Sequence, residues 1–128
     1  MSEKLKHWAK HYFTFRKAFF NEGYEIQETG EGLLLKHKAH EERVVCVDQL
    51  SELNKIKAGV IVTPNTKENV DFLAKNWERF LIPDLRIIFV NLELPNSKWI
   101  IAPFVHNKVC DRSNIKKSLE TLSLMMKE

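Results

Sequence analysis

The spacing of hydrophobic residues near the start of the chain predicts an amphipathic helix. Between Glu3 and Phe20, apolar residues recur three and four positions apart, which places them on one stripe of a helix. We expect this stripe to be buried and the polar positions between its members to face solvent. The stripe consists of Leu5, Trp8, Tyr12, Phe15 and Phe19.

Three short strands are predicted after this helix, because apolar segments there are bounded by turn signals. The turns are Gly30-Glu31-Gly32 and His40-Glu41-Glu42. Their shortness predicts an antiparallel meander. The three strands are Tyr24–Thr29, Leu33–Lys38 and Arg43–Asp48.

Helical and strand patterns alternate in the rest of the chain. Helices are predicted at Leu50–Ala58, around Val70–Phe80 after an N-cap at Thr66, and from near Ser113 onward. A strand–helix–strand unit from Val60 to Val90 favours parallel pairing through a right-handed crossover. The predicted strands are Val60–Thr63, Leu85–Leu94 and Lys98–Val105.

The resulting order is α-β-β-β-α-β-α-β-β-α, which indicates an α/β protein leaning to α+β, with a mixed sheet flanked by helices. The chain has 128 residues, 44% of them hydrophobic and 29% charged, and shows no linker or repeat. We therefore expect a single domain over residues 1–128. No apolar run approaches the ~20 residues that span a bilayer, and no signal peptide is evident, so a cytoplasmic protein is expected.

The segment that follows Gly59 carries a resemblance to a known family. The apolar strand Val60–Thr63 ends in a hydroxyl residue and opens into the helix around Val70–Phe80, followed by the strand Leu85–Asn91. Together with the element order, this pattern resembles the restriction-endonuclease-like fold of PD-(D/E)XK nucleases, especially Mrr-type and RecB-type domains. The resemblance covers roughly Phe15 to Leu92. It implies a core made of a helix, a three-strand meander, a helix and a fourth strand.

The resemblance also implies Mg²⁺-dependent phosphodiester hydrolysis, with an acid on the second strand and an acid-x-Lys motif on the third. This sequence departs from that pattern, because the third strand supplies no acid two residues before a lysine and the second carries Lys36 and Lys38. The remaining catalytic candidates are Glu31, Lys36 and Asp48. We therefore expect a degenerate site with no metal and no cofactor, and Mg²⁺ only if these three residues converge.

Charge is distributed unevenly along the chain. The formal net charge is +3, but residues 1–20 carry +4 and residues 21–32 carry −4. On a helical wheel Lys6, Lys10 and Lys17 fall within about 40° of one another, opposite the apolar stripe, with Arg16 on one flank. Such a face can follow a phosphate backbone, so DNA or RNA is the expected partner. The predicted nucleic-acid-binding residues are Lys6, Lys10, Arg16, Lys17, Lys36 and Lys38.

Two other functions remain open at this point. The domain can be a non-enzymatic interaction or scaffold module, which contacts a protein or a second copy of itself through Phe13 and Phe20 or the edge of the Leu85–Val105 hairpin. It can also be a Mg²⁺-dependent nuclease. The acidic residues 21–32 can also pair with the lysines of the first helix and weaken the attraction for phosphate.

Overall fold

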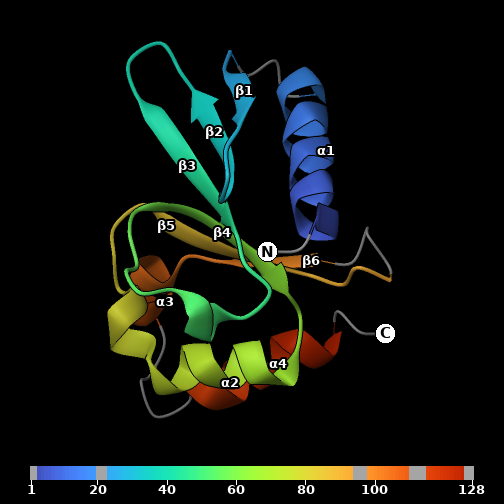
Figure 1. The fold of residues 1–128 in the computed structure, drawn as a ribbon. Coiled ribbons are helices and arrows are strands. Elements are labelled where there is room, and N and C mark those ends of the chain that lie inside the picture. The colour runs from blue at the N-terminus through green and yellow to red at the C-terminus, as the bar shows by residue number, and fades with distance from the viewer. Residues whose placement is uncertain (1–2, 20–22, 94–97, 110–114, 126–128) are drawn as a thin grey trace.

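The computed structural model describes residues 3–19, 23–93, 98–109 and 115–125. Six strands form one mixed sheet, whose spatial order is the chain order (Figure 1). Helices lie on both faces of the sheet, so the predicted fold class is confirmed. The strands are β1 (Glu25–Glu28), β2 (Gly32–Lys36), β3 (Glu41–Cys46), β4 (Gly59–Pro64), β5 (Leu85–Val90) and β6 (Lys98–Ile101).

Strand directions follow from the lengths of the connections. β1, β2 and β3 pair antiparallel through short turns, as the meander prediction requires. β4 pairs parallel with β3, and β5 parallel with β4, whereas β6 returns antiparallel to β5. Parallel pairing needs longer connections, which are a 3₁₀ turn η1 (Leu50–Glu52) before β4 and helix α2 (Lys67–Lys75) with a 3₁₀ turn η2 (Trp77–Phe80) before β5.

Helix α1 (Glu3–Phe19) covers one face of the sheet. Its residues Leu5, Ala9 and Phe13, four positions apart, are buried against strand residues that point to this face. The hydroxyl of Tyr24 donates a hydrogen bond to the carbonyl of Phe13 at 2.7 Å, which ties the segment after α1 back to the helix. The strand residues in this core are Leu33, Leu35, Val44, Cys46, Val60, Val62, Ile88 and Val90.

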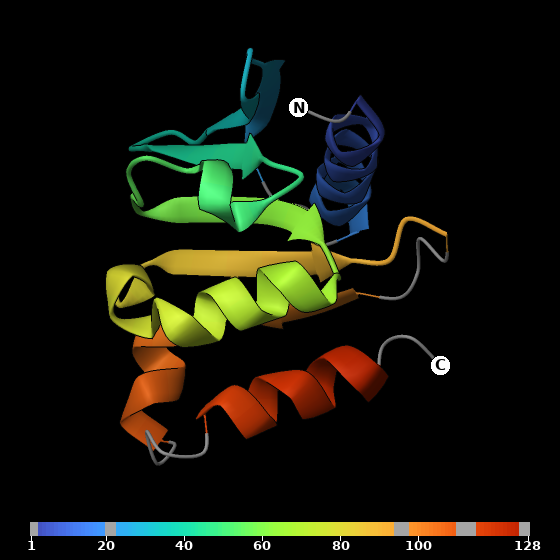
Figure 2. The same cartoon turned by 60° about the horizontal axis from the view of Figure 1, so that its bottom comes forward.

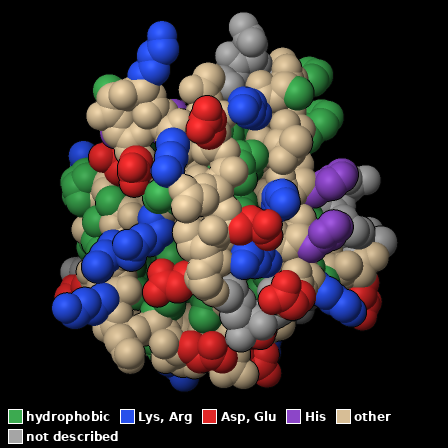
Figure 3. All heavy atoms as spheres, turned by 45° about the horizontal axis from the view of Figure 1, so that its top comes forward, with side chains coloured by type: hydrophobic (Ala, Val, Ile, Leu, Met, Phe, Trp, Pro, Cys, Tyr) green, Lys and Arg blue, Asp and Glu red, His purple; other side chains and the backbone are tan. Residues whose placement is uncertain are grey.

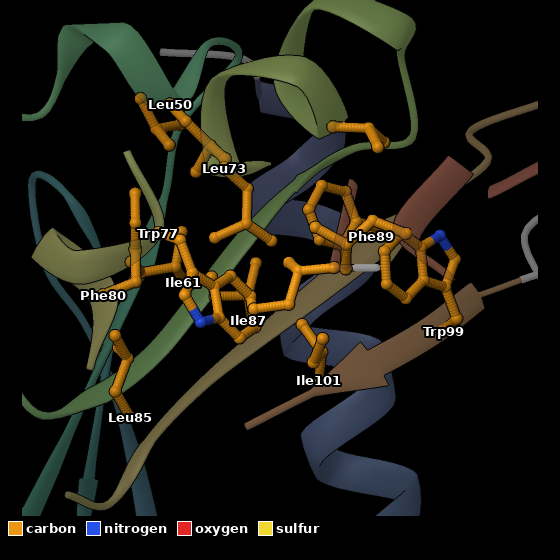
Figure 4. Close-up of a cluster of buried hydrophobic side chains, with 14 residues drawn as sticks. Leu50, Ile61, Leu73, Trp77, Phe80, Leu85, Ile87, Phe89, Trp99 and Ile101 are labelled. Carbon is orange, nitrogen blue, oxygen red and sulfur yellow. The ribbon is translucent and has the colours of Figure 1, made fainter. Parts of the chain in front are cut away.

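The remaining helices cover the opposite face (Figure 2). They are α2, α3 (Pro103–Val109) and α4 (Ile115–Met125). Their core with β4, β5 and β6 is the larger of the two, and the rings of Phe89 and Trp99 stack within it at 4.2 Å between centroids (Figure 4). Among the described residues, no helix is long and apolar enough to cross a membrane.

The prediction of the buried stripe of α1 was wrong at its end. Phe15 and Phe19 are 63% and 70% exposed and stack on each other at 5.6 Å, while the buried line runs through Leu5, Ala9 and Phe13. Hydrophobicity alone does not decide which of two neighbouring stripes meets a sheet. The small side chain of Ala9 in the middle of the line lets the helix approach the strands closely.

Three predicted elements also differ from the structure, one of them the strand expected over Leu85–Leu94, which ends at Val90. The helix expected at Leu50–Ala58 is only the turn η1, whose Leu50 N–H is bound by the side-chain oxygen of Asn69 at 2.9 Å. The strand expected to reach Val105 ends at Ile101, because Pro103 begins α3. Proline suits the first turn of a helix and interrupts the hydrogen bonds of a strand.

Candidate nucleic-acid interface

The three catalytic candidates do not share one end of the sheet. Glu31 precedes β2, and its carbonyl accepts a hydrogen bond from the Cys46 N–H at the end of β3 at 2.8 Å. Asp48 lies two residues beyond Cys46, so both acids are near this end. Lys36 ends β2 and pairs with Glu41 at the start of β3. A strand rises about 3.4 Å per residue, so Lys36 lies roughly 13 Å along β2 from its beginning.

The side chains of the two acids have different surroundings. Glu31 lies 3.9 Å from the guanidinium of Arg43, an exposed pair that contributes little to stability. Glu31 also lines a cavity of about 540 Å³ between β3, β4 and the loop after η1. Asp48 is not among the lining residues, and its carbonyl accepts a hydrogen bond from the Asn69 amide at 3.0 Å. Among the residues the model describes, no group of three metal-ligating side chains comes together.

The charges of this cavity are mixed. Arg43, Lys55 and Lys57 are lining residues, and so are the acids Glu31 and Glu52. Such a lining produces no strong field of one sign. The cavity is therefore a weaker candidate for binding an extended polyanion than a surface with an excess of cations.

Cys46 lies on the α1 face of β3. Its thiol is buried, and burial raises its pKa to about 12, although nearby Lys6 acts to lower it. A thiol with this pKa stays protonated at neutral pH and is a poor nucleophile. Cys46 is a core residue, as its apolar strand indicated. Cys110 lies outside the described residues.

The predicted basic face of α1 lies beside β1. Lys10 forms an ion pair with Glu28 at 3.3 Å, and both side chains are about half exposed. The helical wheel predicted that Lys6 and Lys17 lie opposite the buried stripe. Both are instead half-buried, because they adjoin the buried line Leu5, Ala9 and Phe13. The acidic segment therefore takes up part of the helix's positive charge.

The other two predicted lysines lie at the hairpin between β2 and β3. Lys36 and Lys38 are exposed, and the ladder places Lys36 between Glu25 and Glu41. The rings of His37 and His40 stack in the same turn at 4.3 Å. Figure 3 shows basic and acidic side chains interspersed over the face that it presents. Lys36 thus has an acidic residue beside it on each neighbouring strand, which weakens its attraction for phosphate.

The opposite flank of α1, which faces β6, carries a cluster of aromatic rings and cations that the sequence did not reveal. The rings of Trp8 and Tyr12 stack at 5.0 Å with 9° between their planes. The ammonium of Lys98, from β6, lies 5.3 Å from the centre of the Tyr12 ring, and Arg16 donates a hydrogen bond to the Tyr12 hydroxyl at 3.3 Å. We call Trp8, Tyr12, Arg16 and Lys98 the aromatic–basic flank.

A groove adjoins the aromatic–basic flank at the first half of α1. It has a volume of about 500 Å³, and Trp8 forms part of its wall. The rings of His7 and His11 stack loosely there at 6.2 Å, one turn of helix apart. The other lining residues are Glu3, Lys4 and Leu92.

Arg86 lies next to the aromatic–basic flank, toward the middle of the sheet, but its charge is neutralised by Glu42. It lies on the α1 face of β5, near Tyr12 and Arg16, and its guanidinium contacts the carboxylate of Glu42 at 2.9 Å. Both side chains are partly exposed, so the pair lowers the net field of this surface more than it stabilises the fold.

The candidate interface therefore combines predicted and unpredicted residues. Arg16 was expected, whereas Trp8 and Tyr12 were assigned to the core and Lys98 to a strand without a role. Lys98 is distant from α1 in the sequence, and no periodicity could place it over Tyr12. Comparison of the chain with protein-family models, with curated proteins and with solved structures finds no match in any of the three.

Proposed function

We propose that this chain is a nucleic-acid-binding domain with a restriction-endonuclease-like core and no working nuclease centre. The element order supports the proposal. Helix α1, the meander β1–β3, the turn η1 and strand β4 parallel to β3 follow one another as the resemblance implies, with a single 3₁₀ turn in place of its second helix.

One observation carries the proposal, namely that cationic side chains line both flanks of α1. Lys10 and Lys17 lie on the side of β1, while Arg16 and Lys98 lie on the side of β6. Lys10 is exposed and the other three cations are partly exposed, so a polyanion can reach both flanks. Contacts of this kind with phosphates supply most of the affinity of sequence-independent binding.

The proposal is tested by fluorescence anisotropy with labelled duplex and single-stranded probes between about 50 and about 200 mM salt. The triple variant Lys6→Gln/Lys10→Gln/Lys17→Gln is expected to bind more weakly, with a salt slope shallower by up to about 2.7 for duplex, or 0.9 for each cation. A matched control removes three exposed lysines on the opposite face, Lys67, Lys75 and Lys116. No binding at low salt, or an equal loss in the control, would overturn the proposal.

The absence of catalysis is tested separately. Because Lys36 is remote from Glu31 and Asp48, we expect no cleavage of labelled DNA or RNA with Mg²⁺ or Mn²⁺. Cleavage that is abolished in both Glu31→Ala and Asp48→Ala would replace this part of the proposal by the metal-dependent nuclease.

A second candidate function is an interaction module, which the exposed ring pair of Phe15 and Phe19 favours. Phe13, the residue expected to make such a contact, is buried, and Phe20 lies outside the described residues. Light scattering across protein concentration tests the homo-oligomer version. A mass that rises with concentration in the native chain but not in Phe15→Ser/Phe19→Ser would support this version.

A further inference from the structure

We propose that the aromatic–basic flank of α1 binds unpaired bases of a single-stranded nucleic acid, with Trp8 as the stacking platform. This inference rests on the proposed function and names its substrate class.

The rings on this flank are arranged as a platform for flat ligands. Trp8 and Tyr12 are nearly parallel, and each is half-buried, so the protein holds the rings while part of their surface stays accessible. Trp8 also forms a wall of the 500 Å³ groove, which His7 and His11 continue. A base that enters the groove can stack on the indole, and indoles and imidazoles both stack on bases.

Cations lie where the backbone of such a strand would run. Lys98 and Arg16 both contact Tyr12 and are not among the residues that line the groove, whereas Lys4 is one of its lining residues. Glu3 balances Lys4 in the groove lining, so the excess of positive charge on this side of α1 comes from Arg16 and Lys98. Alternation of stacking rings and positive charges is the pattern by which proteins hold single strands.

A duplex does not fit this combination as well. Its base faces are already occupied by neighbouring bases, so a duplex would contact only the cations and leave the aromatic rings unused. The flank also offers no hydrophobic wedge that enters between paired bases, since Trp8 and Tyr12 lie partly buried along the side of the helix. The aromatic rings therefore favour unpaired bases.

The test compares a labelled single strand of about 12 nucleotides with a duplex of the same length, using the full chain and three variants. Trp8→Leu keeps apolar bulk but removes the flat ring, and Trp8→Phe restores a ring. The third variant, Arg16→Gln/Lys98→Gln, removes two positive charges and no aromatic ring, so it can be measured even if Trp8→Leu fails to fold. Thermal unfolding followed by circular dichroism establishes which variants are folded.

We expect the native chain to prefer the single strand. Trp8→Leu should weaken that binding about 5- to 150-fold, the range for loss of one base–aromatic stack, and leave duplex binding within about twofold. Trp8→Phe should retain most of the affinity. Arg16→Gln/Lys98→Gln should reduce the single-strand salt slope by about 1.4. The bound nucleic acid should quench the fluorescence of Trp8. The other tryptophans, Trp77 and Trp99, are buried, so this quenching should vanish in Trp8→Phe.

The outcomes separate this inference from the proposed function. Duplex binding at least as tight as single-strand binding, or a folded Trp8→Leu with native affinity, would overturn the inference and leave nucleic-acid binding intact. If neither probe binds at about 50 mM salt, the proposed function fails and this inference fails with it.

Discussion

The side chain of Asn69 joins three segments of the fold and allows a quantitative test. It is 2% exposed, and its oxygen accepts the Leu50 N–H at 2.9 Å. Its amide group lies 3.0 Å from the carbonyls of Asp48 and Pro64 and from the hydroxyl of Thr63. Asn69 thus connects α2 to the end of β4 and to the segment that follows β3.

Replacing Asn69 by Ala removes these hydrogen bonds and leaves buried polar groups without a hydrogen-bond partner. Each buried group left unsatisfied costs about 1–3 kcal/mol, and both Leu50 and Thr63 are fully buried. We take about 3 kcal/mol for the whole network, because the carbonyls are only partly buried and can bind water. At an unfolding entropy of about 2.1 cal/mol/K per residue, the melting temperature should fall by about 11 °C.

The assay is thermal unfolding by circular dichroism, with Asn76→Ala as the control on the same helix. The Asn76 amide donates one hydrogen bond to the carbonyl of Phe72 at 2.9 Å in a partly buried place, so its loss should cost about 1 kcal/mol. Asn69→Asp should be less destabilised at pH 4 than at pH 7, because protonation restores one donor. An Asn69→Ala variant that melts within about 3 °C of the native chain would refute the reasoning.

Three other predictions follow from the structure. Gly59 has a φ of +123°, and a Cβ added there would meet the β3 backbone. Gly59→Ala should therefore lower the free energy of unfolding, measured in urea, by more than about 1 kcal/mol. The control Gly30→Ala should not, because the space around Gly30 is open. Phe13→Ala should cost about 3–5 kcal/mol in the same assay, and Phe15→Ala under about 0.5 kcal/mol. Glu28→Gln should release its partner lysine and strengthen low-salt binding in anisotropy; unchanged or weaker binding would contradict a role for that flank.

Local patterns predicted most elements of the fold. The segments that became β2, β4 and β5 were recognised because their apolar runs are bounded by turn residues, and Thr66 is the N-cap of α2, as predicted, accepting the Asn69 N–H at 3.2 Å. Elements and caps of this kind depend on neighbours in the sequence, which is why periodicity finds them.

The candidate site was less predictable. Arg16 and Lys10 were named from the sequence, but the ion pair of Lys10 with Glu28 and the position of Lys98 over Tyr12 depend on which flank of α1 meets which strand. Asn69 gave no sequence signal, since an asparagine in the first turn of a helix is ordinary and only burial makes it a connector.

By itself the sequence determined most of the order of helices and strands, the direction of the meander and the separation of a basic first helix from an acidic first strand, because these depend on residues close together in the chain. Only the tertiary structure decided that Leu5, Ala9 and Phe13 form the buried line of α1, and that Trp8 and Tyr12 lie beside Lys98. The reason is that a helix with apolar residues on more than one stripe has several orientations of similar hydrophobicity, and the closest packing against the sheet selects one.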